Sequence, residues 1–279
     1  MTASDRWGNQ GRFRMADLEI TRDEIHFGAS VTLRFMRTLR IPGSRPDNTR
    51  QPHLGAFPLF QFEDYLEQLP DTWRASRGIF IPLREFEAMW ISLSGRWWKP
   101  NAVKVRSGRI DAITGTPWTD DLRLNPRNYI VCPDQTSCDG VNLGGGAIGQ
   151  FAAPSLADES AVNPRHPRNN VFDSIELVVF EPRAGCFPDR PPRGRVRGND
   201  ACGRPRQSEA AEANTVTSEQ TARVPPATRD SIETWNPLHT TRVCVRLVNS
   251  AQFREITSQD PPPAPVSARD YADAALPPR

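Results

Sequence analysis

Long apolar runs are absent from this 279-residue chain. A membrane-spanning helix needs about 20 consecutive apolar residues, and residues 1–23 are polar and charged where a secretory signal would have an apolar stretch. We therefore expect no membrane span and a cytoplasmic location. The five cysteines are odd in number and irregular in spacing, which favours reduced thiols over a disulfide framework and agrees with that compartment.

Lysine is also scarce. The chain has 35 basic residues, and all of them are arginine except Lys99 and Lys104. Because the arginines are spread along the whole chain, we interpret this bias as compositional rather than as an adaptation to a ligand. The net charge of +2 provides no global field for polyanions. A nucleic-acid partner is therefore not expected.

The motifs of common enzyme classes are missing: there is no Gly-x-Ser-x-Gly elbow, His-Glu-x-x-His pair, P-loop or kinase signature. Residues 144–149 match the Gly-x-Gly-x-x-Gly spacing, but residues 150–154 predict a short strand ended by proline, and a dinucleotide site needs a helix there. We expect a hairpin loop and no cofactor. Each histidine is isolated in a polar or proline-rich context and is expected to be a solvated loop residue: His26, His53, His166 and His239.

Short strand patterns fill most of the chain. Apolar and polar residues alternate over 29–41, and further strands are predicted at 79–83, 88–93, 102–106, 109–113, 128–132, 148–153, 174–180 and 241–248. Short helices are expected over 63–69, 249–256 and 268–276. No long helical pattern intervenes to cover a parallel sheet, so we expect a mainly β fold, α+β with short helices, built as a single β-sandwich or barrel-like domain.

One segment interrupts this pattern. Residues 183–229 are rich in proline and arginine and poor in apolar side chains, which predicts a disordered insertion. The strand at 241–248 needs a partner, because a lone strand is not stable. The expected organisation is a polar tail over 1–27, a β-rich domain over 28–182, the insertion over 183–229, and a segment over 230–279 whose strand and short helices pack back on that domain.

Two tryptophans stand out as candidates for ligand binding. Trp97 and Trp98 lie in a Gly-Arg-Trp-Trp-Lys-Pro loop, and an exposed aromatic pair offers a rigid stacking face. With Gln150 from the glycine-rich loop, they define the expected contact surface for a protein or carbohydrate ligand. Our leading hypothesis is a non-catalytic binding or structural module.

Three other functions are left open. A hydrolase would use Asp134 and Asp139 as acid and base, with Lys104 as a charge stabiliser. A metal site would use Cys132 and Cys138 with these two aspartates, but the paired Cys or His spacing of zinc sites is missing, so we expect no metal. An RNA-contacting protein would use the arginines of 183–206. The glycine and proline content of that stretch suits a linker better.

Several segments, taken in order, resemble a bacterial and fungal family of soluble β-rich proteins. They are residues 33–42, 54–59, 87–92, 102–115, 128–140 with Gln150 and Phe151, and 244–257 with the prolines 261–263. The resemblance implies a β-rich architecture and no particular activity. The family usually has a tryptophan at the position of Ser137 or Cys138, continues differently after Gln150 and extends further than residue 279. This chain is therefore expected to be a truncated or divergent member.

Overall fold

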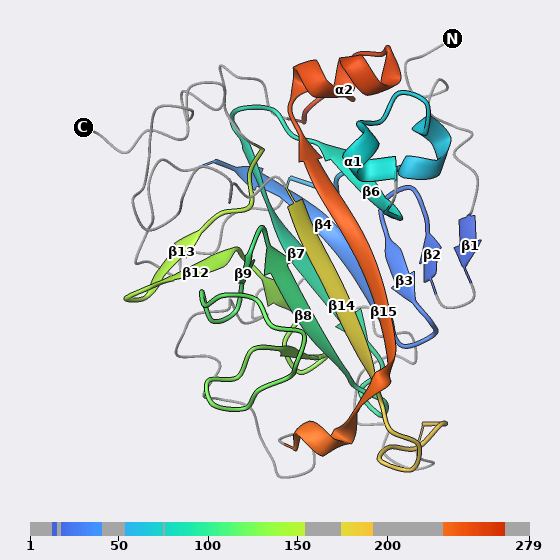
Figure 1. The fold of residues 1–279 in the computed structure, drawn as a ribbon, viewed down its shortest axis with the longest axis vertical. Helices are drawn as coiled ribbons and strands as arrows, with labels where there is room; N and C mark the ends of the chain where they lie inside the picture. The colour runs from blue at the N-terminus through green and yellow to red at the C-terminus, as the bar shows by residue number, and fades with distance from the viewer. Residues whose placement is uncertain are drawn as a thin grey trace.

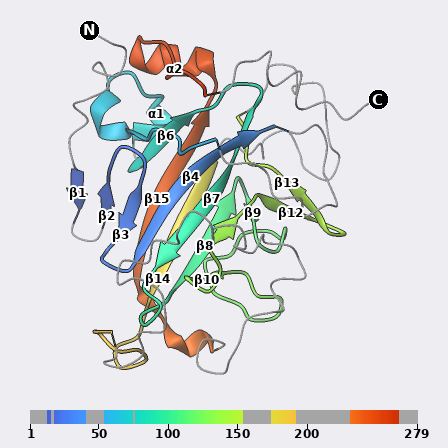
Figure 2. The ribbon, with the colours of Figure 1, turned by 180° about the vertical axis from the view of Figure 1, so that it is seen from behind.

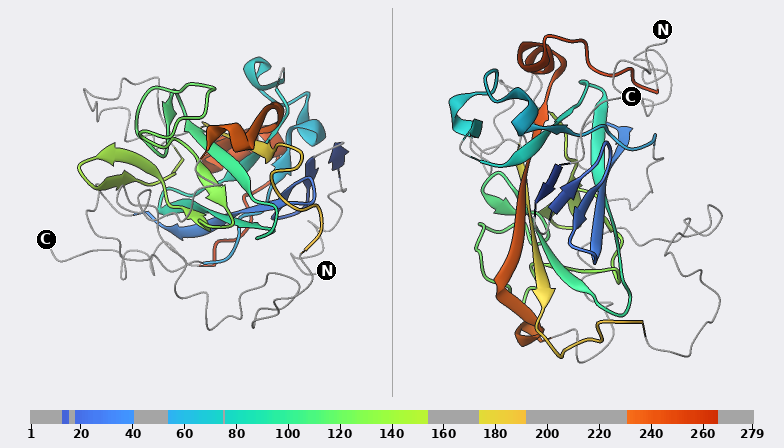
Figure 3. Two further views of the ribbon diagram at one scale, coloured as in Figure 1. Left: turned by 90° about the horizontal axis from the view of Figure 1, so that it is seen from below. Right: turned by 90° about the vertical axis from the view of Figure 1, so that its right-hand side faces the viewer.

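The computed structural model describes residues 13–15, 18–40, 54–74, 76–153, 174–191 and 231–265. Two open β-sheets lie face to face, with a small hairpin at one side and short helices at one end (Figure 1). Seen from the side, the two layers are distinct (Figure 3). The structure thus confirms a mainly β fold, and of the two expected architectures it has the sandwich. No helix in the described ranges has the length and apolar character needed to cross a membrane.

Sheet 1 is antiparallel throughout and faces the viewer in Figure 2. Its strands, in spatial order, are β1 (Phe13–Met15), β2 (Leu18–Ile20), β3 (Ile25–Phe27), β4 (Val31–Leu39), β7 (Glu87–Gly95) and β11 (Ser137–Cys138). The alternation that predicted a strand at 29–41 is the pattern of β4, where Val31, Leu33 and Phe35 are buried and Arg34 is exposed. Strands β4 and β7 pair along their full lengths, from Val31 opposite Gly95 to Leu39 opposite Glu87.

Sheet 2 contains the strand expected to return across the insertion. Its strands are β10 (Ile130–Cys132), β8 (Asn101–Ser107), β14 (Ser174–Pro182), β15 (Trp235–Val248), β6 (Gly78–Pro82) and β5 (Phe60–Gln61), with β9 (Ile110–Asp111) paired to β8. Strand β15 lies between β14 and β6, antiparallel to the first and parallel to the second. The C-terminal strand is therefore an interior strand of the sheet, as its need for a partner predicts.

Apolar side chains from both sheets meet in one core. It contains Leu33, Phe35 and Ile91 from sheet 1 and Val105 and Leu177 from sheet 2, all fully buried. At about 25 cal/mol for each Å² of apolar surface removed from water, a shared core of this kind is the main favourable term for the sandwich. The two layers are held together by this burial.

Short helices cover the outer face of sheet 2 at the β5–β6 edge. They are η2 (Phe62–Tyr65), α1 (Asp71–Arg74) and α2 (Ser250–Thr257), and Phe60 stacks on Phe80 while its ring edge meets Phe253 of α2. Asn249 caps α2 with a capping box: the Asn249 side chain accepts from the backbone N–H of Gln252, and the Gln252 side chain accepts from the backbone N–H of Asn249. This confirms the helix expected over 249–256. Another short helix, η7 (Ile232–Thr234), precedes β15.

The organisation of the N-terminal residues differs from the expectation. Residues 18–27, expected in a polar tail, form β2 and β3, and Leu18, Ile20, Ile25 and Phe27 belong to the shared core. Their apolar side chains alternate with polar ones over only three residues in each strand, too short a pattern to be recognised alone. Most of the expected insertion, 183–229, and the expected helix over 268–276 lie outside the described residues.

Candidate functional site

The β7–β8 turn presents an exposed aromatic ring. Trp97 is 54% exposed, and its ring meets Trp98 edge to face, with centroids 5.7 Å apart and an interplanar angle of 82°. The Arg96 guanidinium lies 5.6 Å from the centroid of the Trp98 ring. Trp98 therefore lies between the Arg96 guanidinium and the Trp97 ring, and Trp97 is the most exposed of the three.

This turn is fastened to its neighbours on two sides. The Arg96 backbone N–H donates to the Ser30 carbonyl in the β3–β4 turn. The Lys99 ammonium pairs with Asp189, at 2.8 Å, in the segment that follows β14. This pairing lowers the pKa of the Asp189 carboxyl. Trp97 is thus displayed on a braced turn at one end of the sandwich.

Gln150 lies at the other end of the sheet. Its amide N–H donates to the Leu39 carbonyl at 3.1 Å, and Leu39 is paired with Glu87 at the start of β7, whereas the tryptophans follow its end. At about 3.3 Å per residue, the eight steps from Glu87 to Gly95 along β7 separate the two places by at least about 26 Å. The structure brings Trp97 and Trp98 together and does not bring Gln150 to them.

Lys104 is fully buried on β8, under a loop that follows β9. Its ammonium donates to the carbonyls of Thr119 and Asp121, the latter at 2.9 Å, and lies 3.7 Å from the Asp111 carboxylate. The Trp118 ring covers it, with its centroid 4.3 Å from Nζ. Burial lowers the pKa of Lys104 and Asp111 opposes this, while burial raises the pKa of Asp111. These contacts fasten the loop to the sheet.

The two aspartates proposed as acid and base lie elsewhere, next to two thiols. Asp134 follows β10 and Asp139 follows β11, and each contributes to raising the pKa of the nearby Cys132 or Cys138 thiol. Burial is the larger cause, and it raises both thiol pKa values to about 12. Lys104 has its carboxylate partner in Asp111 rather than in this pair.

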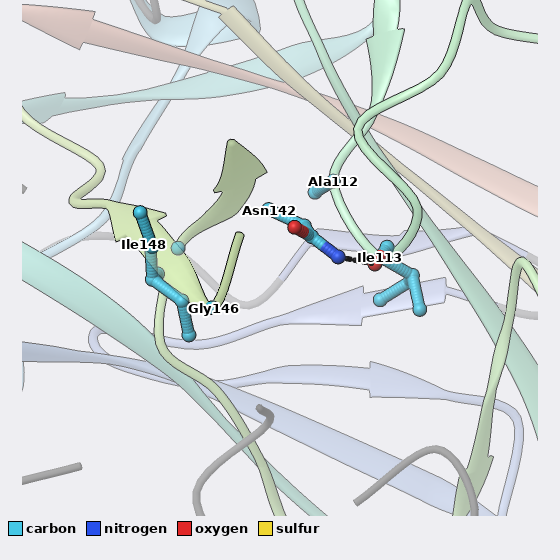
Figure 4. Close-up of a pocket in the computed structure, with 7 residues that line it drawn as sticks. Ala112, Ile113, Asn142, Gly146 and Ile148 are labelled. Atoms are coloured by element: carbon cyan, nitrogen blue, oxygen red, sulfur yellow. Dashed lines mark hydrogen bonds between the residues drawn. The ribbon is translucent and has the colours of Figure 1, made fainter. Parts of the chain in front are cut away.

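The glycine-rich segment forms the expected hairpin. Strands β12 (Val141–Gly144) and β13 (Ala147–Gly149) pair in antiparallel fashion, and Gly144, Gly145 and Gly146 have positive φ angles. A hollow of about 10 Å³ between this hairpin and Ile113 has room for about one water molecule. Figure 4 shows the Asn142 side chain crossing it to the Ile113 carbonyl. The pairing of β12 with β13 confirms the hairpin interpretation, and residues 150–153, the described residues that follow it, contain no helix.

Comparison of the chain with protein-family models, with curated proteins and with solved structures gave no match. The resemblance seen in the sequence therefore stays a prediction. Within the described ranges, no three His, Cys, Asp or Glu side chains gather in a way that could hold a metal ion. The described cysteines, Cys132, Cys138, Cys186 and Cys244, are free thiols.

A constellation that the sequence did not suggest lies on the outer face of sheet 1. His26, expected in a loop, is on β3 directly opposite Thr32 of β4, and its Nδ1 lies 2.9 Å from the Thr32 hydroxyl. Its Nε2 lies 3.0 Å from the Glu24 carboxylate. The signal was present in the sequence: two three-residue apolar–polar–apolar patterns flank the turn at Gly28, which would place residues 26 and 32 side by side in a hairpin.

Proposed function

We propose that this protein is a binding module that holds a carbohydrate ligand against Trp97. The observation that carries the proposal is the 54% exposure of a tryptophan ring whose partner, Trp98, is held beneath it on a braced turn. An exposed aromatic ring offers an apolar face to a ligand, and a rigid ring loses little conformational entropy on binding. The free thiols support a reducing compartment such as the cytoplasm.

The surroundings of Trp97 favour a sugar over a protein surface. A protein interface places its aromatic anchor within about 800 Å² of contact on each partner, in a region depleted of charge. The residues around Trp97 in the turn are instead charged: Arg96, Lys99 and, paired with Lys99, Asp189. A sugar ring stacks its C–H face on one aromatic ring and needs polar groups beside it for its hydroxyls. One ring in a polar setting matches that requirement.

The test is a titration of the purified protein with soluble neutral and uronic-acid polysaccharides. Binding is monitored by tryptophan fluorescence and by affinity electrophoresis. We expect Trp97→Ala to weaken binding about tenfold, because an aromatic contact contributes about 1.5 kcal/mol beyond its buried area. Leu66→Ala is the matched control, since Leu66 is 47% exposed and lies in the η2 region that covers the β5–β6 edge of sheet 2. Binding that survives Trp97→Ala, or no binding to any polysaccharide, refutes the proposal.

A further inference from the structure

We propose that Thr32, His26 and Glu24 form a proton relay that makes the Thr32 hydroxyl a nucleophile toward activated acyl and phosphoryl groups. This activity is separate from ligand binding at Trp97 and does not depend on it. The three side chains come from β4, β3 and the turn before β3, and they form one continuous chain of close polar contacts across the outer face of sheet 1.

Strand register produces the first contact. His26 and Thr32 are directly opposite each other in the β3–β4 hairpin, while the flanking pairs, Ile25 with Leu33 and Phe27 with Val31, point into the core. Side chains on a strand alternate between faces, so the imidazole and the hydroxyl are forced onto the same outer face. Their separation of 2.9 Å between Nδ1 and Oγ1 is that of a hydrogen bond.

Glu24 orients the imidazole. Its Oε2 lies 3.0 Å from His26 Nε2, and its Oε1 accepts from the Arg34 guanidinium. The backbone of Glu24 is also fixed. The Glu24 N–H donates to the Thr21 hydroxyl, and the Glu24 carbonyl accepts from the Thr21 N–H. With Nε2 donating to the carboxylate, Nδ1 is left as the acceptor for the Thr32 hydroxyl proton. We assign the ring hydrogens from these partners.

This arrangement meets the geometric requirement for an activated hydroxyl: a nucleophile within hydrogen-bond reach of a base that a third group orients. As the Thr32 Oγ1 bonds to the carbonyl carbon of an ester, its proton passes to His26 Nδ1. The bond from that carbon to the alkoxy oxygen breaks, and the alcohol leaves with this proton. Water, deprotonated by His26, then releases the acid and restores the hydroxyl.

The relay is open to small reagents. The side chains of His26 and Glu24 are 30% and 20% exposed. Thr32 is paired with Ser94 on its other side, and Ser94 precedes Trp97 by three residues. Three residues span at most about 11 Å, so the relay lies near the end of the sandwich that displays Trp97.

The test uses diisopropyl fluorophosphate on the full-length protein, with peptide mass spectrometry to locate the adduct. The Thr32 Oγ1–P bond forms, fluoride leaves and the proton passes through His26 to solvent. We expect the adduct on Thr32, about a hundredfold slower labelling in His26→Gln, slower labelling in Glu24→Gln, no adduct at this position in Thr32→Val and retained labelling in Thr32→Ser. Ser94→Ala, which removes the neighbouring hydroxyl on the same face, should label at the wild-type rate.

Two outcomes overturn the relay. One is the absence of any adduct on Thr32, whether or not a hydroxyl elsewhere in the protein is labelled. The other is a Thr32 adduct that forms equally fast in His26→Gln, which would mean that the imidazole moves no proton. Urea unfolding of each variant separates these results from misfolding. Should Thr32→Val unfold, Thr32→Ser and His26→Gln decide the outcome, and polysaccharide binding at Trp97 is measured separately.

Discussion

The buried pair of Lys104 and Asp111 gives the sharpest test of the described structure. The side chains are 0% and 2% exposed, and they fasten the loop after β9 to sheet 2. Lys104→Met keeps the length and apolar stem of the side chain while removing the ammonium. It leaves the Asp111 carboxylate buried without its counter-charge and takes the donor from the carbonyls of Thr119 and Asp121.

The expected loss is large for a single substitution. Removing one partner of a buried ion pair destabilises a protein by about 3–5 kcal/mol, because the other charge remains desolvated. Adding Asp111→Asn removes that charge and keeps an Oδ1 acceptor for the N–H groups of Ile113 and Thr114. The double variant should therefore recover about 2 kcal/mol and retain the loss of the two carbonyl contacts, about 1–3 kcal/mol.

The assay is urea unfolding, followed by far-UV circular dichroism and tryptophan fluorescence. With a slope of about 2–3 kcal/mol per molar, Lys104→Met should lower the midpoint by about 1–2.5 M. Arg242→Met is the control, since its pair with Asp120 is closer, at 2.9 Å against 3.7 Å, but exposed, and should contribute less than about 1 kcal/mol. A Lys104→Met protein as stable as this control would refute the buried geometry.

The pH dependence adds a second check on the same pair. Burial lowers the pKa of Lys104 below its ordinary value of 10.5, so the folded state binds this proton less tightly than the unfolded state. The associated destabilisation is present below the folded pKa and disappears as the pH rises through 10.5. Relative to the Lys104→Met/Asp111→Asn double variant, the wild-type free energy of unfolding should therefore rise as the pH increases toward 10.5.

Two further predictions concern other buried groups. Glu87→Gln should destabilise the protein by about 3–5 kcal/mol in urea unfolding, because Arg37, 3.0 Å away, would lose its counter-charge where both side chains are at most 6% exposed; a loss below 1 kcal/mol would contradict this. At pH 8, iodoacetamide should label Cys186 and leave Cys132 and Cys138 unmodified until the protein is denatured, because Cys186 is exposed while the other thiols are buried with pKa values near 12; peptide mass spectrometry distinguishes the sites.

Periodicity predicted the long strand β4 and missed the three-residue strands β2 and β3. Strand β4 has nine residues, so its alternation is unmistakable, and the need of 241–248 for a partner predicted its return to the sheet. Strands β2 and β3 have three residues each. A three-residue pattern is compatible with a turn as well as with a strand. These two segments are strands because their apolar side chains pack in the shared core. Tertiary context decided what local pattern could not.

The position of a candidate residue on a strand follows from the local sequence, but the groups that surround it do not. Alternation along β8 correctly sends Val103 and Val105 into the core and Lys104 to the opposite face, where a charged residue is expected to meet water. The sequence near Lys104 does not indicate that the loop after β9 covers that face. The position of Lys104 on the strand was therefore predictable, but its burial, and its pairing with Asp111 rather than with Asp134 or Asp139, was not.

The Thr32 relay needs one step of tertiary context, the pairing of β3 with β4, after which the order of residues along the two strands is enough to find it. A hairpin with its turn at Gly28 fixes which residues oppose each other, and from that point the chemistry of the outer face follows from reading residues in pairs. His26 looks isolated in the linear sequence, but in the hairpin it lies opposite Thr32. A single-residue slip of this register would turn the imidazole into the core and Ile25 and Phe27 outward. The same burial that stabilises β3 therefore holds the imidazole against the hydroxyl.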